Sequence, residues 1–167
     1  MDLEVNYAGR VREMPYNLHL LTAYQPHNVS EVEGSGRTEN AGFFGNAPIV
    51  RASFIASITP MENLKISVLE RWRDRMLWVP RQSAPLPTLI VPMPDISPTF
   101  YTNLNVGYTL KHGGGGQTEI YGNIANLFDR APPISAAYNN TQPGIFGVIA
   151  GDDVIGRYYT VGFRHRL

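Results

Sequence analysis

Apolar and polar residues alternate along most of this chain with a period of two. The longest such run closes the sequence, over residues 154–167, where Tyr159 and Val161 alternate with polar or small residues. Successive side chains of a β-strand point to opposite faces, so the run predicts a strand with one apolar and one polar face. It is longer than the typical strand of about five or six residues. It also reaches the ~9–11 residues that a tilted strand needs to cross a bilayer.

The same alternation recurs upstream. Six more segments show it: 3–8, 16–24, 49–59, 64–73, 100–111 and 118–127. Together with the last run they predict an all-β chain, an antiparallel up-and-down meander of about seven long strands. Glu70 falls on the apolar side of its segment, and we expect this position near a membrane rim, where a charge costs little.

The predicted connections alternate in length. The short turns are 9–15, 60–63 and 112–117, and the long loops are 25–48, 79–98 and 129–153. Outer-membrane barrels have short periplasmic turns and long extracellular loops, whereas a sandwich has no reason to separate them in this way. The pattern therefore favours a transmembrane β-barrel whose C-terminus lies on the periplasmic side.

The polar side of the predicted strands indicates the size of that barrel. It carries Arg51, Lys65, Arg71, Arg73, Asn103, Asn105, Asn123 and Arg164. A small dry core would bury these groups at a large desolvation cost, whereas a wide lumen would keep them wet or hold them against a plug domain. We therefore expect the chain to be an open portion of a large barrel, of about 22 strands.

Composition excludes several classes. The chain has 167 residues, with 14 basic and 14 acidic side chains, so nothing indicates a nucleic-acid partner. It contains no cysteine and no stretch of ~18 apolar residues that could form a transmembrane helix. The N-terminus has no secretory signal pattern. For an outer-membrane protein this predicts that residues 1–167 are the tail of a longer chain.

Two motifs near the end resemble TonB-dependent receptors. The first is Asn-Leu-Phe-Asp at 126–129, within the stretch 120–133, and the second is Gly-Arg-Tyr-Tyr at 156–159. The resemblance is clear over residues 98–167. It implies that residues 1–167 are the C-terminal part of a receptor β-barrel that takes up a scarce large nutrient, such as a siderophore, a vitamin or a glycan. The plug domain is absent from these residues, so the energy-coupling protein would act only through the missing N-terminal part.

The final octet resembles the assembly signal that ends outer-membrane barrel proteins. That signal has a polar residue, a glycine two positions later, and hydrophobic or aromatic residues at the antepenultimate and last positions. The matching positions are Thr160, Gly162, Phe163, His165 and Leu167, with His165 where an aromatic residue is usual and Leu167 where phenylalanine is usual. The resemblance implies outer-membrane lipid and the barrel-assembly machinery as partners, and the Gram-negative outer membrane as the location.

Candidate catalytic chemistry is weak. His19, His27, His112 and His165 are scattered without ligand spacing. The last long loop holds Asp129, Asp152 and Asp153, which either bind calcium or form a solvated or strand-capping cluster. Gly113 to Gly116 is not followed by the Gly-Lys-Ser/Thr of a phosphate loop. We expect no enzymatic activity, no cofactor and no metal site, and the sequence names no substrate-binding residue.

Two other interpretations stay open. One is a soluble all-β sandwich that binds a partner through its loops. The other is a smaller porin-like barrel that lacks one or a few strands. The surroundings of the apolar face discriminate the first from a barrel, because in a sandwich that face packs dry against a second sheet.

Overall fold

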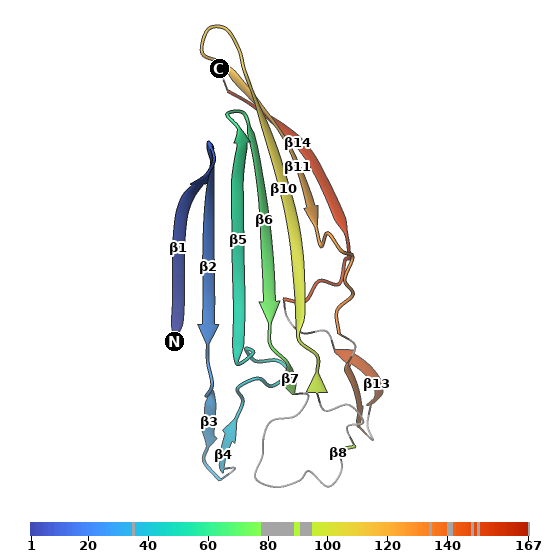
Figure 1. Ribbon diagram of the computed structural model, residues 1–167. Helices are drawn as coiled ribbons and strands as arrows, with labels where there is room; N and C mark the ends of the chain where they lie inside the picture. Colours follow the sequence, from blue (N-terminus) through green and yellow to red (C-terminus); the bar gives the residue numbers. More distant parts are fainter. Residues whose placement is uncertain are drawn as a thin grey trace.

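A computed structural model describes residues 1–34, 36–77, 89–90, 95–133, 135–139, 142–147, 149 and 151–166. The described chain is all-β, and its main feature is a seven-stranded antiparallel sheet (Figure 1). Its strands are β1 (Asp2–Val11), β2 (Met14–Tyr24), β5 (Val50–Met61), β6 (Leu64–Arg73), β10 (Thr99–Lys111), β11 (Gln117–Ala125) and β14 (Tyr158–Arg166). No helix in these residues is long and apolar enough to cross a membrane.

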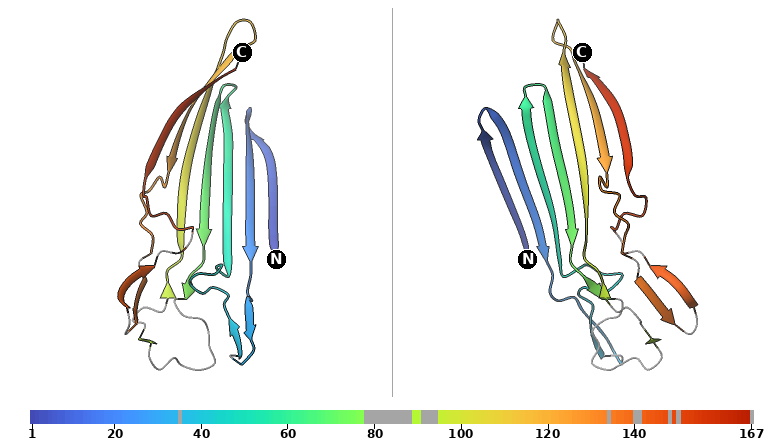
Figure 2. Two further views of the ribbon diagram at one scale, coloured as in Figure 1. Left: turned by 180° about the vertical axis from the view of Figure 1, so that it is seen from behind. Right: turned by 45° about the vertical axis from the view of Figure 1, so that its right-hand side comes forward.

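The sheet is an open meander. Each strand pairs with the sheet strand that follows it in the chain, so β1 and β14 are the two edges. Figure 2 shows the seven strands as one curved layer whose two edge strands lie far apart. The predicted antiparallel meander is confirmed.

The register aligns the apolar sides of all seven strands on one face, which we call the apolar face. One row of directly paired residues illustrates it: Tyr7, Leu18, Ala56, Val68, Leu104, Ile124 and Tyr159. A slip of one residue between any two strands would move a whole apolar set to the other side, so the sequence pattern itself selects this register. The opposite side, the polar face, carries the cations and amides expected there.

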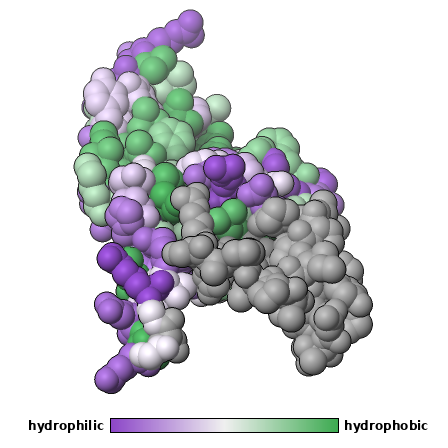
Figure 3. Space-filling model, turned by 90° about the horizontal axis from the view of Figure 1, so that it is seen from below, coloured by the Kyte–Doolittle hydropathy of each residue, from purple (hydrophilic) through white to green (hydrophobic). Residues whose placement is uncertain are grey.

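Much of the apolar face lies open. Val161 is 80% exposed, Phe163 76% and Ile120 47%. Figure 3, viewed from the end with the long connections, shows hydrophobic residues gathered along one stretch of the molecule. A sandwich requires a second sheet packed against this face. In the described part of the chain no second sheet covers it. Glu70, the charge on the apolar face, accepts a hydrogen bond from the Thr102 hydroxyl on the neighbouring strand.

Short and long connections lie at opposite ends of the sheet, as predicted (Figure 1). The short-turn end also holds the C-terminus. The long connections contain short strands that the sequence pattern missed. These are β3 (Val29–Val32) with β4 (Gly36–Glu39), β7 (Met76–Leu77) with β9 (Asp95–Ile96), and β12 (Ser135–Asn139) with β13 (Gln142–Gly147) and β8 (Leu89–Ile90). Part of the predicted loop 79–98 lies outside the described residues.

The last strand was predicted to begin too early. It begins at Tyr158, because Val154 to Arg157 form a turn. The Asp153 carboxylate accepts the backbone N–H groups of Ile155 and Gly156 at 3.0 and 3.3 Å, and Gly156 has a φ of +81°. A left-handed residue and a side-chain cap interrupt strand geometry, whatever the hydropathy of the residues.

The first turn is tighter than the predicted 9–15. β1 runs to Val11 and β2 begins at Met14, with Arg12 at a φ of 56°. The turn between β5 and β6 consists of Glu62 and Asn63, and the pairing of the two strands is irregular between Ile58 and Met61.

A small hydrophobic core lies among the long connections. Met76, Ile96 and Ile149 are buried together, and Phe44 packs against them. This core holds Ile149, and Gly151 and Asp152 lie next to the polar-face ends of β5, β6 and β10. It therefore shapes the cavity described next.

Candidate functional site

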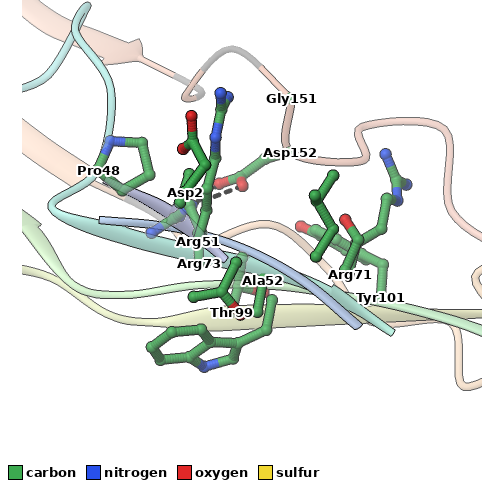
Figure 4. A pocket seen from close by; sticks show the side chains of 15 residues that line it. Asp2, Pro48, Arg51, Ala52, Arg71, Arg73, Thr99, Tyr101, Gly151 and Asp152 are labelled. Atoms are coloured by element: carbon green, nitrogen blue, oxygen red, sulfur yellow. Dashed lines mark hydrogen bonds and ion pairs between the residues drawn. The ribbon is translucent and has the colours of Figure 1, made fainter. Parts of the chain in front are cut away.

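A cavity of about 510 Å³ lies on the polar face at the end of the sheet that carries the long connections. Strands β2, β5, β6 and β10 line one side, and Pro48, Gly151 and Asp152 of the connections line another (Figure 4). Its apolar lining includes Leu21 and Ala23. Three arginines project into the same space, so the cavity is amphipathic.

The strand register brings the three arginines together. Arg51 on β5 lies directly opposite Arg73 on β6, and Arg71 lies opposite Tyr101 on β10. Like charges directly opposite each other destabilise a sheet. The arrangement therefore needs compensating groups.

Asp152 compensates only Arg73. The Arg73 Nε and Nη2 atoms donate to the two carboxylate oxygens of Asp152 at 2.8 and 2.6 Å. Arg73 Nη1 donates to the carbonyls of Ser97 and Asp74 at 3.0 and 3.2 Å. The side chains of Arg73 and Asp152 are only 10% and 2% exposed. This bidentate, charge-assisted pair ties two long connections to the end of β6.

Arg51 and Arg71 have no carboxylate partner in the described residues. The Arg71 guanidinium lies 5.8 Å from the centre of the Tyr101 ring. Thr99 and Tyr101 are 2% and 3% exposed, and in the described part of the chain their hydroxyls have no hydrogen-bond partner. The cavity therefore combines two unneutralised cations with two orphaned hydroxyls.

The three aspartates of the last long connection have separate partners. Asp152 binds Arg73, Asp153 caps the turn before β14, and Asp129 accepts the Arg157 backbone N–H at 2.8 Å. Among the described residues, no group of three or more His, Asp or Glu is placed to hold a metal ion. The capping interpretation fits Asp153 and Asp129. The calcium interpretation is not supported, because the described residues bring no set of calcium ligands together.

The two motifs that carry the family resemblance lie against each other. The Asp129 carboxylate holds the backbone of Arg157, and a Cβ at Gly156 would lie 2.9 Å from Asp129 Oδ1. Asn126 starts this turn with a φ of 48° and bonds both the N–H and the carbonyl of Arg130, at 2.8 and 2.9 Å. The motifs thus lie at the two ends of the connection from β11 to β14.

The C-terminal residues with the assembly-signal pattern lie on both faces of β14. Thr160 and Gly162 are on the polar face, and Phe163 and His165 are on the apolar face. Leu167 lies outside the described residues. A Cβ at Gly162 would lie 2.4 Å from Tyr121 Oη, so this position accommodates the tyrosine ring.

Two histidines that the sequence left scattered meet at the short-turn end. The Thr118 hydroxyl lies 2.7 Å from His112 Nε2 and 2.8 Å from His165 Nδ1. Only the pairing of β11 with β14 brings them together, and no spacing rule predicts it. Aromatic side chains near the strand ends lie mostly on the apolar face: Tyr16, Tyr24, Trp72, Phe100 and Tyr159. Tyr158 lies on the polar face, and Trp78 lies outside the described residues.

Comparison with known proteins does not identify the chain. No protein-family model matches its sequence, and neither a curated protein nor a solved structure matches it. The fold defines an all-β chain built on a seven-stranded antiparallel meander.

Proposed function

We propose that residues 1–167 form part of the wall of a transmembrane β-barrel, and specifically the C-terminal wall segment of a TonB-dependent outer-membrane receptor. The observation that carries this proposal is the continuous apolar face, which runs across all seven strands and stays uncovered in the described residues. Burying one large apolar side chain contributes about 1.5–3 kcal/mol. A face with this many apolar side chains is therefore costly in water and favourable against lipid.

The two open edges support incorporation into a larger barrel. The outer sides of β1 and β14 have no strand partner in the described sheet. An unpaired backbone group in hydrocarbon costs several kcal/mol, so a spanning sheet must close with further strands. The unneutralised arginines on the polar face favour a wide, wet or plugged interior, as in barrels of about 22 strands.

The direction of the strands supports the placement in the envelope. All short turns lie at one end and all long connections at the other, which matches periplasmic turns and extracellular loops. The contact between Asp129 and Arg157 joins the two receptor-like motifs at the long-connection end. The proposed substrate is a scarce large nutrient of the siderophore, vitamin or glycan class. Energy coupling would come from the periplasmic partner through other parts of the protein.

A pair of neighbouring residues on β10 tests the lipid-facing assignment. Val106 lies on the apolar face and Asn105 on the polar face. The chain is mixed with phosphatidylcholine vesicles, in which copies can pair along the open edges of β1 and β14, and incorporation is measured by co-flotation. We expect Val106→Arg to reduce incorporation by roughly 30-fold or more, because an arginine near the bilayer midplane costs about 2–4 kcal/mol. Asn105→Arg, the matched control, should incorporate like the wild type.

Fluorescence provides a second readout on the same vesicles. In a Trp78→Phe variant, Trp72 on the apolar face is the single tryptophan of the chain. We expect brominated lipids to quench it and aqueous iodide to leave it bright. Equal incorporation of the two β10 variants, or strong quenching by iodide, would contradict the proposal.

A further inference from the structure

We propose that the cavity on the polar face binds an organic anion, a carboxylate joined to an apolar body, with the carboxylate held between Arg51 and Arg71. The two arginines lie on β5 and β6 of the sheet whatever surrounds it, so a failure of this proposal would leave the barrel assignment standing.

The ion pairs and hydrogen bonds around the cavity show that Arg51 and Arg71, but not Arg73, are available to a ligand. Arg73 has its donors occupied by Asp152 and by two backbone carbonyls. Arg51 and Arg71 are exposed to the cavity and have no carboxylate partner in the described chain. These two cations are therefore available to a ligand.

Their spacing suits a single oxyanion. Arg51 pairs with Arg73, and Arg71 pairs with Ser53, so Arg51 and Arg71 are diagonal neighbours on adjacent strands. Such neighbours are about 7–8 Å apart at the backbone, within reach of long side chains that converge on one group. The planar guanidinium presents two parallel N–H donors that match the two oxygens of a carboxylate.

The remaining lining indicates the body of the ligand. Leu21, Ala23 and Pro48 are apolar members of the same lining. The hydroxyls of Thr99 and Tyr101 are buried without a partner in the described residues, and they lie on the strand next to Arg71. A ligand oxygen that reached either hydroxyl would recover a hydrogen bond that the free chain lacks.

Asp2 is the one other carboxylate in the lining, and it opposes an anion. It pairs with Ala23, which pairs with Arg51, so Asp2 lies two strands away from Arg51. Two strand spacings correspond to about 10 Å between the backbones, and Figure 4 shows the Asp2 side chain beside Arg51. Asp2 therefore opposes a ligand carboxylate at Arg51, and removal of the Asp2 charge should tighten binding.

The test is calorimetric titration of the full chain, in micelles with an uncharged headgroup, with phthalate as the anionic probe. Dimethyl phthalate is the uncharged control of similar shape. We expect phthalate to bind and the ester not to bind. Arg51→Gln and Arg71→Gln should each weaken phthalate binding by about tenfold or more, since a charged hydrogen bond contributes about 1.5–3 kcal/mol.

Three further variants make the test specific. Asp2→Asn should tighten binding. Tyr101→Phe should weaken binding without lowering thermal stability, because the lost hydroxyl has no partner in the described chain. Arg10→Gln removes a polar-face cation outside the cavity lining, and it should change the affinity by less than about twofold.

Several outcomes would overturn the proposal: equal binding of phthalate and its ester, an equal loss with Arg10→Gln, or folded Arg51→Gln and Arg71→Gln variants with wild-type affinity. If an arginine variant unfolds, as judged by circular dichroism, the proposal is tested instead by the comparison of phthalate with its ester and by the affinity of the Asp2→Asn variant. An unchanged affinity in Asp2→Asn, together with binding of the ester, would then overturn it.

Discussion

Gly162 lets the ring of Tyr121 lie across the neighbouring strand. Tyr121 is directly opposite Gly162 on β14 and Gly107 on β10, and its ring lies over Gly162 on the polar face. A Cβ at Gly162 would lie 2.4 Å from Tyr121 Oη and 2.5 Å from its ring. The position with the glycine of the assembly-signal pattern thus has a packing reason in the chain itself.

We expect Gly162→Ala to destabilise the pairing of β11 with β14 by about 1–3 kcal/mol, because an inserted methyl group forces the ring to move. Urea unfolding in micelles measures this loss. Gly122→Ala is the matched control, since a Cβ there would meet no atom within 4 Å. Adding Tyr121→Ser to Gly162→Ala should remove the clash and recover part of the loss. Equal stability of the two alanine variants would refute the packing explanation.

Glu39 in the β3–β4 hairpin gives a prediction about pH. The backbone N–H of Asn28, the ring of His27 and the backbone N–H of Ala41 lower the pKa of the Glu39 carboxyl from 4.5 to about 2. A carboxyl with a lowered pKa stabilises the folded hairpin fully above pH 4.5, and the contribution is lost as the pH falls toward 2.

We therefore expect the amide signals of Asn28 and Ala41 to titrate with a midpoint near pH 2 in an acid NMR titration of the folded chain. Glu39→Gln should abolish this titration and loosen the hairpin at neutral pH. A midpoint near 4.5 would show that the two N–H groups do not hold the carboxylate.

At the scale of elements, the Arg73–Asp152 pair connects the end of β6 to the connection that precedes β14. Its members are far apart in the chain and both are largely buried. An unpaired charge left in such a place is strongly destabilising, whereas an apolar pair of similar size is tolerated. The pair therefore controls whether Gly151 and Asp152 stay docked beside the cavity.

We expect Asp152→Ala to cost about 3–5 kcal/mol and to expose the connection around Gly151 to limited proteolysis. The double change Arg73→Met with Asp152→Leu should recover most of the loss. The control is Glu119→Gln, which breaks the exposed pair with Arg164 and should cost less than about 1 kcal/mol. Similar costs for Asp152→Ala and Glu119→Gln would contradict the anchoring role.

At the scale of the whole molecule, the sheet has a protected middle and two open edges. Strands such as β6 and β10 pair on both sides, while β1 and β14 pair on one side only in the described residues. Alternate N–H groups of an edge strand point away from the sheet and form no ladder bonds.

Hydrogen exchange of the chain in micelles should show this difference. We expect most amides of β6 and β10 to be protected, and the outward N–H groups of β1 and β14 to exchange fast. Uniform protection of both edge strands would mean that they have found partners, for example in a second copy of the chain. Sedimentation of the same sample would show whether such copies associate.

The period of two predicted the strands and the membership of both faces, since side-chain direction in a strand depends only on position parity. It also predicted which connections are long. It missed the hairpins at 29–39 and 135–147, whose short strands show no long alternation. It placed the start of the last strand at Val154, because hydropathy contains no information on the Asp153 cap or on the φ of Gly156.

The candidate site was largely hidden from sequence reasoning. The alternation placed Arg51, Arg71 and Arg73 on the polar side. It did not predict that Arg73 has a carboxylate partner and that the other two arginines have none in the described residues. That distinction depends on Asp152, which a distant connection brings to the sheet. The histidine pair at Thr118 also exists only through strand pairing.

The sequence by itself determined an all-β meander with one apolar and one polar side, because alternation and turn chemistry are local properties of the chain. The tertiary structure alone decided which charges are paired, where the cavity lies, and that the apolar face stays uncovered in the described residues. Those features depend on contacts between residues far apart in the chain, and such contacts are formed by strand register and by loop docking rather than by local preference.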